Sequence, residues 1–490
     1  MSIIAKLTSG AGDLGRKFRK SLIGACAFVL AGCAATGGPF GLTEEQGRAL
    51  GDQEHPKIVA AFGGELDDPE LKAYVQRIHD RLIAASSQPD ADIQITLLDS
   101  PVVNAMALPG HTYVTRGLLA LANSEAELAG VMGHEIGHIY GRHTAKRVSR
   151  GNLAQIGAAA AAILTGDQDT AQLAGQAAQL YLLRFSRQQE YEADQYGVRM
   201  LAAAGYDPLG EAEFLNTLGR WSNLEMQIAG AQRPPEFLST HPNTAERVRR
   251  AAEEAQVLGQ NTSGKQKSRR DYLRQIDGVI YGDDPVKQGF IRGRDFIHPT
   301  IGIAFTVPQG FQLQNSSQAV LARSQTGAQM QFTGGSSQET PTAIINGPLS
   351  QNLQVDLSPA VAINVNGRQG AVGQARANTQ SGQVDVTAYV IRWEGTTNYI
   401  FLWVTPANQT RQLQNPIARS VESLRIIDPR TANTPPARQI DVVTVQQGDT
   451  VSGLANRTLF PNHKQERFII MNGLSSDGAL RAGDEVKLVR

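Results

Sequence analysis

The sequence predicts a multidomain protein with a mainly α-helical first domain that includes a small β-sheet, an α+β middle domain, and a small βααβ C-terminal domain. Three observations support this prediction. A chain of 490 residues is too long for one hydrophobic core. Its 41% hydrophobic and 19% charged residues are typical of folded rather than disordered protein. Its apolar pattern is helical in the first half and alternates beyond about residue 297.

Charge and cysteine content exclude several classes of function. The 46 basic residues balance the 46 acidic ones, which excludes a nucleic-acid binder that works by bulk positive charge. The two cysteines are too few for a disulfide scaffold or a Cys-rich zinc site. Both lie within the first 33 residues, where they bear on targeting.

The N-terminus has the pattern of a targeting signal. A basic cluster at 16–20 precedes a short apolar run that is too short to cross a bilayer, which takes about 20 residues. The run ends in Leu-Ala-Gly-Cys at 30–33, which resembles a bacterial lipoprotein cleavage site. We therefore expect a lipoprotein signal peptide over 1–32 and lipidation at Cys33; a plain signal peptide is the alternative.

The residue that follows Cys33 predicts where the lipoprotein goes. It is Ala34 rather than Asp, which resembles the sorting rule for the outer membrane of Gram-negative bacteria. The expected location is the periplasmic side of the outer membrane, in the cell envelope.

Composition divides the rest of the chain into segments. The expected boundaries are 33–41 for a lipidated tether, 42–258 for the first domain, 259–296 for a connecting segment, 297–427 for the α+β domain, 428–439 for a Pro-rich linker and 440–490 for the last domain.

Local signals place the elements of the first domain. Asp68-Pro69 predicts the start of a helix, and the alternating segment 92–98 predicts a strand. Residues 104–114, with Pro109-Gly110 in the middle, read as a β-hairpin. The capping box at 124–127 begins the next helix.

Further along, alternation at 384–390 and 399–404 predicts strands of the middle domain, and 409–424 predicts its closing helix. We find no motif that gives this domain a function.

The segment 134–138 reads His-Glu-Ile-Gly-His and lies inside the helix that the capping box begins. Residues four apart share a helix face, so His134 and His138 can bind one zinc ion. Glu135 beside them can act as general base toward the zinc-activated water. A chance match on a solvated helix is the alternative, but the apolar flanks argue against it, because burying these side chains without a metal is costly.

Two candidates exist for a third ligand. A known pattern with a third His further along has Thr144 at that position, and His143 comes one residue too early, so we expect a structural role for His143. Glu190 and Asp194 are four apart and share a helix face. Glu190 can complete a His-His-Glu set, and Asp194 can accept the remaining N–H of a ligand imidazole.

At this point the sequence resembles a known family. The His-Glu-x-Gly-His motif followed by Ser-Arg-x-x-Glu-x-x-Ala-Asp at 186–194 resembles the HtpX-type and CAAX-prenyl-protease-like gluzincin metallopeptidases. The branch of secreted lipoproteins with BepA and LoiP is the most similar in layout. The resemblance covers about 42–251 and implies a zincin fold, one Zn²⁺ per chain and a zinc metalloendopeptidase.

Two further elements resemble this family. The segment 104–110 resembles the hairpin ahead of the zinc helix, which implies a substrate-binding edge strand at Asn104, Ala105 and Met106, although Met106 replaces the usual aromatic residue. His241-Pro242 with Arg247 resembles an HPxxxxR element, which implies that His241 and Arg247 stabilise an oxyanion. Alternatively, His241 fills the open zinc position and keeps the enzyme latent, or it only begins a helix.

The C-terminal segment resembles a LysM domain, a family of small βααβ domains that bind N-acetylglucosamine-containing glycans. The matching residues are Thr444 to Thr450, Leu454-Ala455, Asn472-Gly473-Leu474 and Leu480 to Leu488. The pattern departs from the family at Gly453 and between Phe460 and Phe468, so a packing or docking module is the alternative.

Together these features predict a lipid-anchored zinc endopeptidase of the bacterial envelope. The related branch works in quality control, so the expected substrates are unfolded or misassembled envelope proteins. Further expected partners are the membrane through the lipid and peptidoglycan through the LysM-like domain, with no nucleic acid. A peptidoglycan hydrolase lacks its usual motif here, and a glycan-binding lipoprotein with a chaperone-like role remains the alternative.

Overall fold

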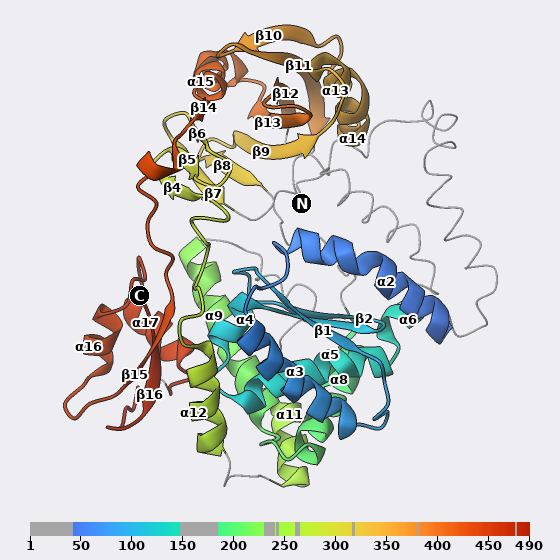
Figure 1. Ribbon diagram of the computed structural model, residues 1–490, viewed down its shortest axis with the longest axis vertical. Coiled ribbons are helices and arrows are strands. Elements are labelled where there is room, and N and C mark those ends of the chain that lie inside the picture. Colours follow the sequence, from blue (N-terminus) through green and yellow to red (C-terminus); the bar gives the residue numbers. More distant parts are fainter. Residues whose placement is uncertain are drawn as a thin grey trace. The chain divides into compact units, whose positions relative to one another are not determined.

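The computed structural model describes residues 43–147, 185–229, 241, 245–259, 265–315, 319–379, 382–475 and 478–490. The expected signal peptide, Cys33 and Pro242 lie outside these ranges. Within them, Asp283–Ala437 form one compact unit, and the described residues before and after it form a second (Figure 1).

The second unit contains a three-stranded sheet of order β1-β3-β2. Its strands are β1 (Gln94–Leu98), β2 (Ala105–Leu108) and β3 (His111–Thr115). β1 pairs with β3 in parallel and β2 pairs with β3 antiparallel, so the predicted hairpin is confirmed. Its turn needs glycine at Gly110, where φ is +84°. β2 lies at an edge of the sheet.

Helices cover both faces of this sheet (Figure 1). The helices described before residue 283 are α2 (Glu44–Ala61), α3 (Pro69–Ala84), α4 (Arg116–Leu121), α5 (Glu125–Tyr140), α6 (His143–Arg147), α8 (Arg187–Ala203), α9 (Gly210–Ala229), α11 (Ala245–Leu258) and α12 (Lys265–Ile276), and α2, α3, α4 and α5 contact the sheet. Alternation along β3 separates the faces. Tyr113 contacts His55 of α2, whereas Thr112 contacts His79 of α3. The predicted helix starts are confirmed, because Asp68 caps α3 and Ser124 caps α5.

Helices α5 and α8 approach each other closely through glycines. A Cβ atom on Gly133 would lie 3.0 Å from the Cα atom of Gly197, and one on Gly137 would lie 3.0 Å from the Ala193 carbonyl oxygen. Larger residues would push the helices apart. This close packing places the acidic side chains of α8 beside the histidines of α5.

The C-terminal segment forms a βααβ module that packs on these helices. Its elements are β15 (Ile440–Thr444), α16 (Val451–Asn456), α17 (Lys464–Met471) and β16 (Glu485–Val489). β15 and β16 pair antiparallel. Leu454, Phe468 and Leu488 belong to the module's own core, whereas Met471 and Val489 join the core of the helical domain.

The structure differs from the sequence prediction over 259–296, where a connecting segment is expected. Helix α12 lies there, and its Tyr272, Leu273 and Ile276 are fully buried. The Tyr272 hydroxyl donates a hydrogen bond to the Leu119 carbonyl oxygen at 2.6 Å. The apolar stripe is sparse within a strongly basic sequence, which explains why composition alone suggests an exposed segment.

The 283–437 unit is inserted between two adjacent segments of the chain. The Gly278 amide donates to the Ile440 carbonyl oxygen at 2.8 Å, and the Tyr281 amide donates to Arg438 at 2.7 Å. The expected linker 428–439 therefore ends in this pairing instead of leading to a freely tethered module.

The inserted unit consists of two antiparallel sheets and short helices. One sheet has the order β10-β11-β12-β13-β9-β8-β7 and the other β14-β6-β5-β4. The strands are β4 (Phe290–Arg292), β5 (Asp295–His298), β6 (Ile303–Thr306), β7 (Phe311–Asn315), β8 (Val320–Ser324), β9 (Gln329–Ser336), β10 (Val361–Val365), β11 (Arg368–Thr379), β12 (Gly382–Arg392), β13 (Thr397–Pro406) and β14 (Arg425–Ile426). The helices are α13 (Pro341–Ile344), η4 (Ile345–Leu349), α14 (Ser350–Leu353), α15 (Thr410–Glu422) and η5 (Pro429–Thr431). The predicted strands lie within β12 and β13, and the closing helix is α15.

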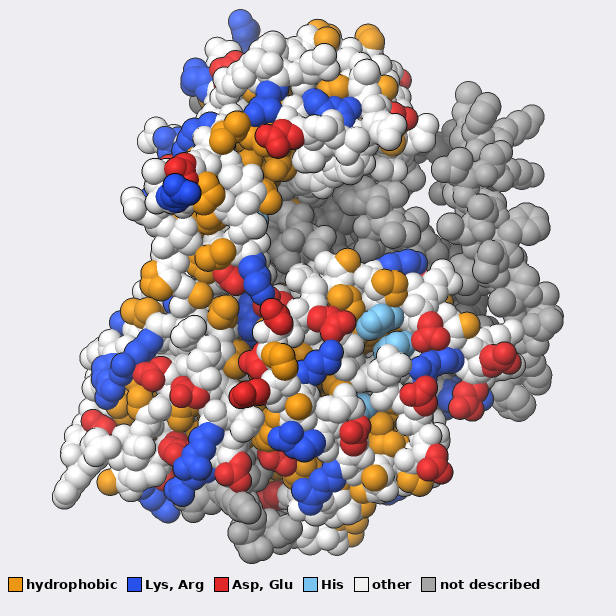
Figure 2. All heavy atoms as spheres, in the orientation of Figure 1, with side chains coloured by type: hydrophobic (Ala, Val, Ile, Leu, Met, Phe, Trp, Pro, Cys, Tyr) orange, Lys and Arg blue, Asp and Glu red, His pale blue; other side chains and the backbone are white. Residues whose placement is uncertain are grey.

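Charges of both signs alternate on the face drawn in Figure 2, with no field of a single sign. No helix within the described ranges has both the length and the hydropathy to cross a membrane.

Candidate metal centre

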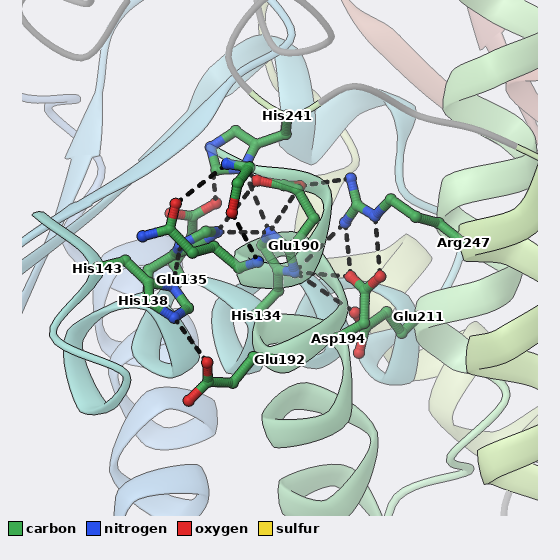
Figure 3. A network of polar contacts seen from close by, with 12 residues as sticks. His134, Glu135, His138, His143, Glu190, Glu192, Asp194, Glu211, His241 and Arg247 are labelled. Atoms are coloured by element: carbon green, nitrogen blue, oxygen red, sulfur yellow. Dashed lines mark hydrogen bonds and ion pairs between the residues drawn. The ribbon is translucent and has the colours of Figure 1, made fainter. Parts of the chain in front are cut away.

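Four potential ligands converge in the helical domain (Figure 3). Helix α5 supplies His134 and His138, α8 supplies Glu190, and His241 precedes α11. Their ligand atoms all lie within 4.8 Å of one another, and all four side chains are buried. The Nε2 atoms of His134 and His138 are 3.0 Å apart, and His241 Nδ1 lies 3.3 Å from His134 Nε2. The structure thus brings together the three predicted ligands and adds a fourth nitrogen.

The chemistry of this donor set fits a metal ion. Asp194 Oδ1 lies 2.9 Å from His134 Nδ1, so that nitrogen carries the proton and Nε2 presents its lone pair to the cluster. His138 Nδ1 lies 2.9 Å from His143 Nδ1, which leaves its Nε2 facing inward as well. Two inward-facing nitrogens 3.0 Å apart are close enough to bind the same cation, and His-His-Glu is a zinc-type ligand set.

Arg247 contacts two carboxylates of α8, Glu190 and Asp194. Its Nε and Nη2 atoms donate to Asp194 Oδ2 and Oδ1 at 2.8 and 2.6 Å, and its Nη1 atom lies 2.7 Å from Glu190 Oε2. Burial opposes ionisation of Asp194, but Arg247 outweighs it and holds the pKa of that carboxyl below its usual value. These contacts favour a positioning role for Arg247. Its role toward an oxyanion stays a prediction.

Glu211, in the first turn of α9, is a residue of the site that sequence reasoning missed. Its Oε1 atom lies 3.6 Å from His134 Nδ1, on the side of Asp194. A Cβ atom on Gly197 would lie 2.3 Å from Glu211 Oε2, so only glycine leaves room for this carboxyl. Burial raises the pKa of Glu211 well above its usual value. An acidic residue in a first helical turn usually only balances the helix dipole, which is why the sequence hides this role.

Glu135 lies beside the ligands with an unused oxygen. Its Oε1 atom is 3.8 Å from His241 Nε2 and has no hydrogen-bond partner in the part of the chain that the structure describes. Burial raises the pKa of this carboxyl, while the neighbouring His241 and His134 lower it. A carboxylate with a raised pKa next to a metal site is suited to accept a proton near neutral pH.

His143 takes the structural place that the sequence predicts. Its Nδ1 atom faces His138 Nδ1, and its Nε2 atom lies 3.3 Å from Glu192 Oε2. Glu192, which looks purely solvated in the sequence, therefore helps to orient His138 through His143.

Phe185, the residue before the cap of α8, was also missed. Its ring centroid lies 3.8 Å from that of His138 and 5.2 Å from that of His241. The ring shields one side of the cluster from water. A lone Phe near a helix start carries no signal that would identify it.

The expected substrate strand packs against α5. Ala105 and Met106 belong to β2, Asn104 directly precedes it, and all three residues are buried. β2 pairs only with β3 among the described strands, so it has one unpaired edge there. Whether a peptide pairs with that edge stays a prediction.

Comparison with known proteins identifies two parts of the chain. Residues 69–255 match peptidase family M48, and residues 443–489 match the LysM domain. A beta-barrel assembly-enhancing protease of Yersinia pestis is 28% identical over 242 residues, which are 47% of this chain and 48% of that protein. The mitochondrial metalloendopeptidase OMA1 of Schizosaccharomyces pombe is 32% identical over 193 residues, 38% of this chain and 54% of that protein.

The chain thus spans about half the length of these curated relatives. The solution structure of PsbP from Synechocystis sp. covers 28% of this chain and 98% of its own at 13% identity, with a TM-score of 0.23. That score is too low to support an argument about fold. The M48 match covers the helices that carry the ligand cluster, and residues 69–255 are therefore an M48 peptidase domain, joined in this chain to a C-terminal LysM domain.

Proposed function

We propose that this protein is a lipid-anchored, zinc-dependent endopeptidase of the bacterial cell envelope that cleaves misfolded or misassembled envelope proteins. The observation that carries the proposal is the convergence of His134, His138 and Glu190, with Glu135 beside them. The names of the relatives, beta-barrel assembly-enhancing protease and metalloendopeptidase, support the reaction class and the envelope substrates.

His134, His138 and Glu190 would hold one Zn²⁺, which when bound supplies Lewis-acid chemistry toward water and a peptide carbonyl. Asp194 keeps the His134 proton on Nδ1, and His143 can accept the proton of His138 Nδ1, so that both Nε2 lone pairs would face the metal. Arg247 holds Glu190 and Asp194 in place. These contacts fix the ligands before the metal binds.

Glu135 moves the proton in the proposed reaction. Its Oε1 atom takes a proton from the attacking water and later delivers it to the leaving amine. The buried surroundings, including the ring of Phe185, keep bulk water from forming hydrogen bonds with the Glu135 carboxylate. The extended substrate would lie along the edge of β2, with its backbone paired to residues 104–106.

His241 has two proposed roles. Its Nδ1 atom lies within the ligand cluster, 3.2 Å from Glu190 Oε1, which supports a resting state in which this nitrogen occupies the fourth zinc position. In the alternative, His241 moves aside and stabilises the oxyanion. X-ray absorption on the zinc-loaded protein separates them, because identical coordination in wild type and His241→Ala would rule out the resting-state role.

The location and the partners complete the proposal. Cys33 would carry the lipid on the periplasmic side of the outer membrane. The LysM domain supports contact with peptidoglycan glycans. A mainly glycan-binding, chaperone-like protein is the second candidate, and the intact ligand cluster favours the peptidase over it.

The test uses residues 34–490 with zinc and an unfolded substrate, reduced and carboxymethylated α-lactalbumin. Wild type should produce peptide fragments, and Glu135→Gln should produce none while it binds the same amount of zinc. Digestion of purified sacculi serves as the control for a peptidoglycan hydrolase. Zinc binding without fragments from wild type would favour the binding protein or the latent state.

A further inference from the structure

The LysM domain and the peptidase helices share one buried core. Ile440, Ile470, Met471 and Val489 of the LysM domain pack in the same apolar cluster as side chains of α3, α5, α9 and α12. A freely tethered targeting module would keep its own separate core. The two domains therefore form one structural body within this unit of the chain.

Lys487 forms the most specific contact between them. Its side chain is completely buried, and its Nζ atom donates to the carbonyl oxygens of Ala120, Leu121 and Ala122 at 2.9, 3.0 and 2.7 Å. An ammonium group has three N–H donors, so this contact uses all of them. The carbonyls belong to the C-terminal end of α4, where a cation is favourable.

This contact lies directly before the helix that carries the ligands. The segment from Ala122 to Ser124 joins α4 to α5. Arg269 of α12 donates to the Asn123 carbonyl oxygen at 3.1 Å and to Asn472 of the LysM domain at 3.3 Å. The LysM domain and α12 thus jointly fix the position of the start of α5.

A second contact connects the LysM domain to α9, the helix that carries Glu211. Arg467 of α17 forms an ion pair with Glu225 of α9, and its guanidinium lies 5.3 Å from the centroid of the Trp221 ring. Arg220 donates to the Leu474 carbonyl oxygen at 2.7 Å. Helix α9 begins with the turn that places Glu211 beside His134.

We propose that the LysM domain is a positioning element of the metal centre. Through Lys487 and Arg467 it fixes the start of α5 and the course of α9, so metal affinity and turnover depend on it. The effect on turnover rests on the proposed peptidase function, whereas the effect on metal affinity does not. Lys487 is a positioning residue, because it touches neither ligands nor substrate.

The test compares zinc affinity in Lys487→Met and Lys464→Met, both in residues 34–490. Lys464 is the matched control, because its Nζ atom donates to the carbonyl oxygens of Asn456 and Thr458, both inside the LysM domain. Competition with a chromophoric chelator gives the zinc dissociation constant at a temperature where circular dichroism shows every variant folded.

We expect Lys487→Met to weaken zinc binding and to lower kcat by about tenfold each, the lower end for residues that orient ligands, with KM within about twofold. Lys464→Met should leave both quantities within about twofold of wild type. Hydrogen exchange at 122–128 should rise in Lys487→Met only. Wild-type zinc affinity in Lys487→Met, or an equal loss in Lys464→Met, would overturn the proposal.

Arg467→Gln keeps the test decisive if Lys487→Met does not fold. It removes the ion pair with Glu225 between the LysM domain and α9. We expect zinc binding to weaken about threefold, less than in Lys487→Met, because this contact is further from the start of α5. Unchanged affinity in this variant would then overturn the proposal. If wild type cleaves nothing, the peptidase proposal fails, but the comparison of zinc affinities still decides this one.

Discussion

Arg247 and Lys487 are both buried cations, but their surroundings balance the charge in different ways. Under the metal ligands, Arg247 lies against two carboxylates, Asp194 and Glu190. Where the LysM domain packs on α4, the Nζ atom of Lys487 donates to three backbone carbonyls instead. The first region pairs full charges, so each partner depends on the other. The second places its charge on helix-end carbonyls and interacts with the buried Glu127 only through space, so its loss leaves less opposite charge unbalanced.

Among the variants compared here, Arg247→Met should lower the free energy of unfolding the most. It leaves Asp194 and Glu190 buried without their cation, and such a loss costs about 3–5 kcal/mol of the free energy of unfolding. Urea denaturation of the metal-free protein measures it, because a bound zinc ion would itself neutralise Glu190. Arg247→Lys should not restore the loss, because Lys cannot donate to both carboxylates in the same planar geometry. Near wild-type stability in Arg247→Met would contradict the account.

His79 is a buried basic side chain that, unlike Arg247 and Lys487, is neutral near pH 7. Burial lowers its pKa to about 4, and Asp80 at 3.9 Å only partly opposes this. The unfolded chain binds the His79 proton more tightly than the folded one. The contribution of neutral His79 to the free energy of unfolding is therefore fully present above about pH 6.5 and is lost as the pH drops toward 4. At about 1.4 kcal/mol per pKa unit, the loss approaches 3 kcal/mol.

Urea denaturation between pH 8 and pH 4 measures this effect as the difference between wild type and His79→Gln. Carboxylates titrate in both proteins and cancel in that difference. The same pH dependence in both would show that His79 is not the group responsible.

Lys487→Met should cost less than Arg247→Met. It leaves carbonyl groups without donors, at about 1–3 kcal/mol, but it also removes the cost of burying an ammonium. Thermal unfolding of the two variants side by side measures the order. If the Lys487 variant is the less stable of the two, the distinction between paired and dipole-balanced charge is wrong.

Exposed charges should matter least. Glu246 of α11 bonds Arg249 and Arg250, and all three side chains are largely exposed. Glu246→Gln should leave the melting temperature within error of wild type, since solvent screens such pairs. A clear drop in differential scanning calorimetry would mean that surface pairs, and not buried cations, hold this domain together.

The core of the metal site could be predicted from sequence because its spacing is local. His134 and His138 are four apart on one helix, and Glu190 and Asp194 repeat that spacing on another. Local signals also gave the β2–β3 hairpin and the caps of α3 and α5.

Contacts between distant segments could not be predicted in this way. Glu211 reaches His134 only because Gly197 admits its carboxyl. Lys487 alternates with apolar neighbours along its strand and so resembles a solvent-facing residue, but that face is the one that packs on α4. Helix α12 was hidden by its basic composition.

The most direct test is a zinc titration of the metal-free protein with cleavage of the unfolded substrate measured at each step. The account predicts that activity rises to a plateau at one zinc per chain. Glu135→Gln should bind the same single zinc and cleave nothing. Cleavage that does not require zinc, or that persists in Glu135→Gln, would contradict the assignment of this cluster as the active site.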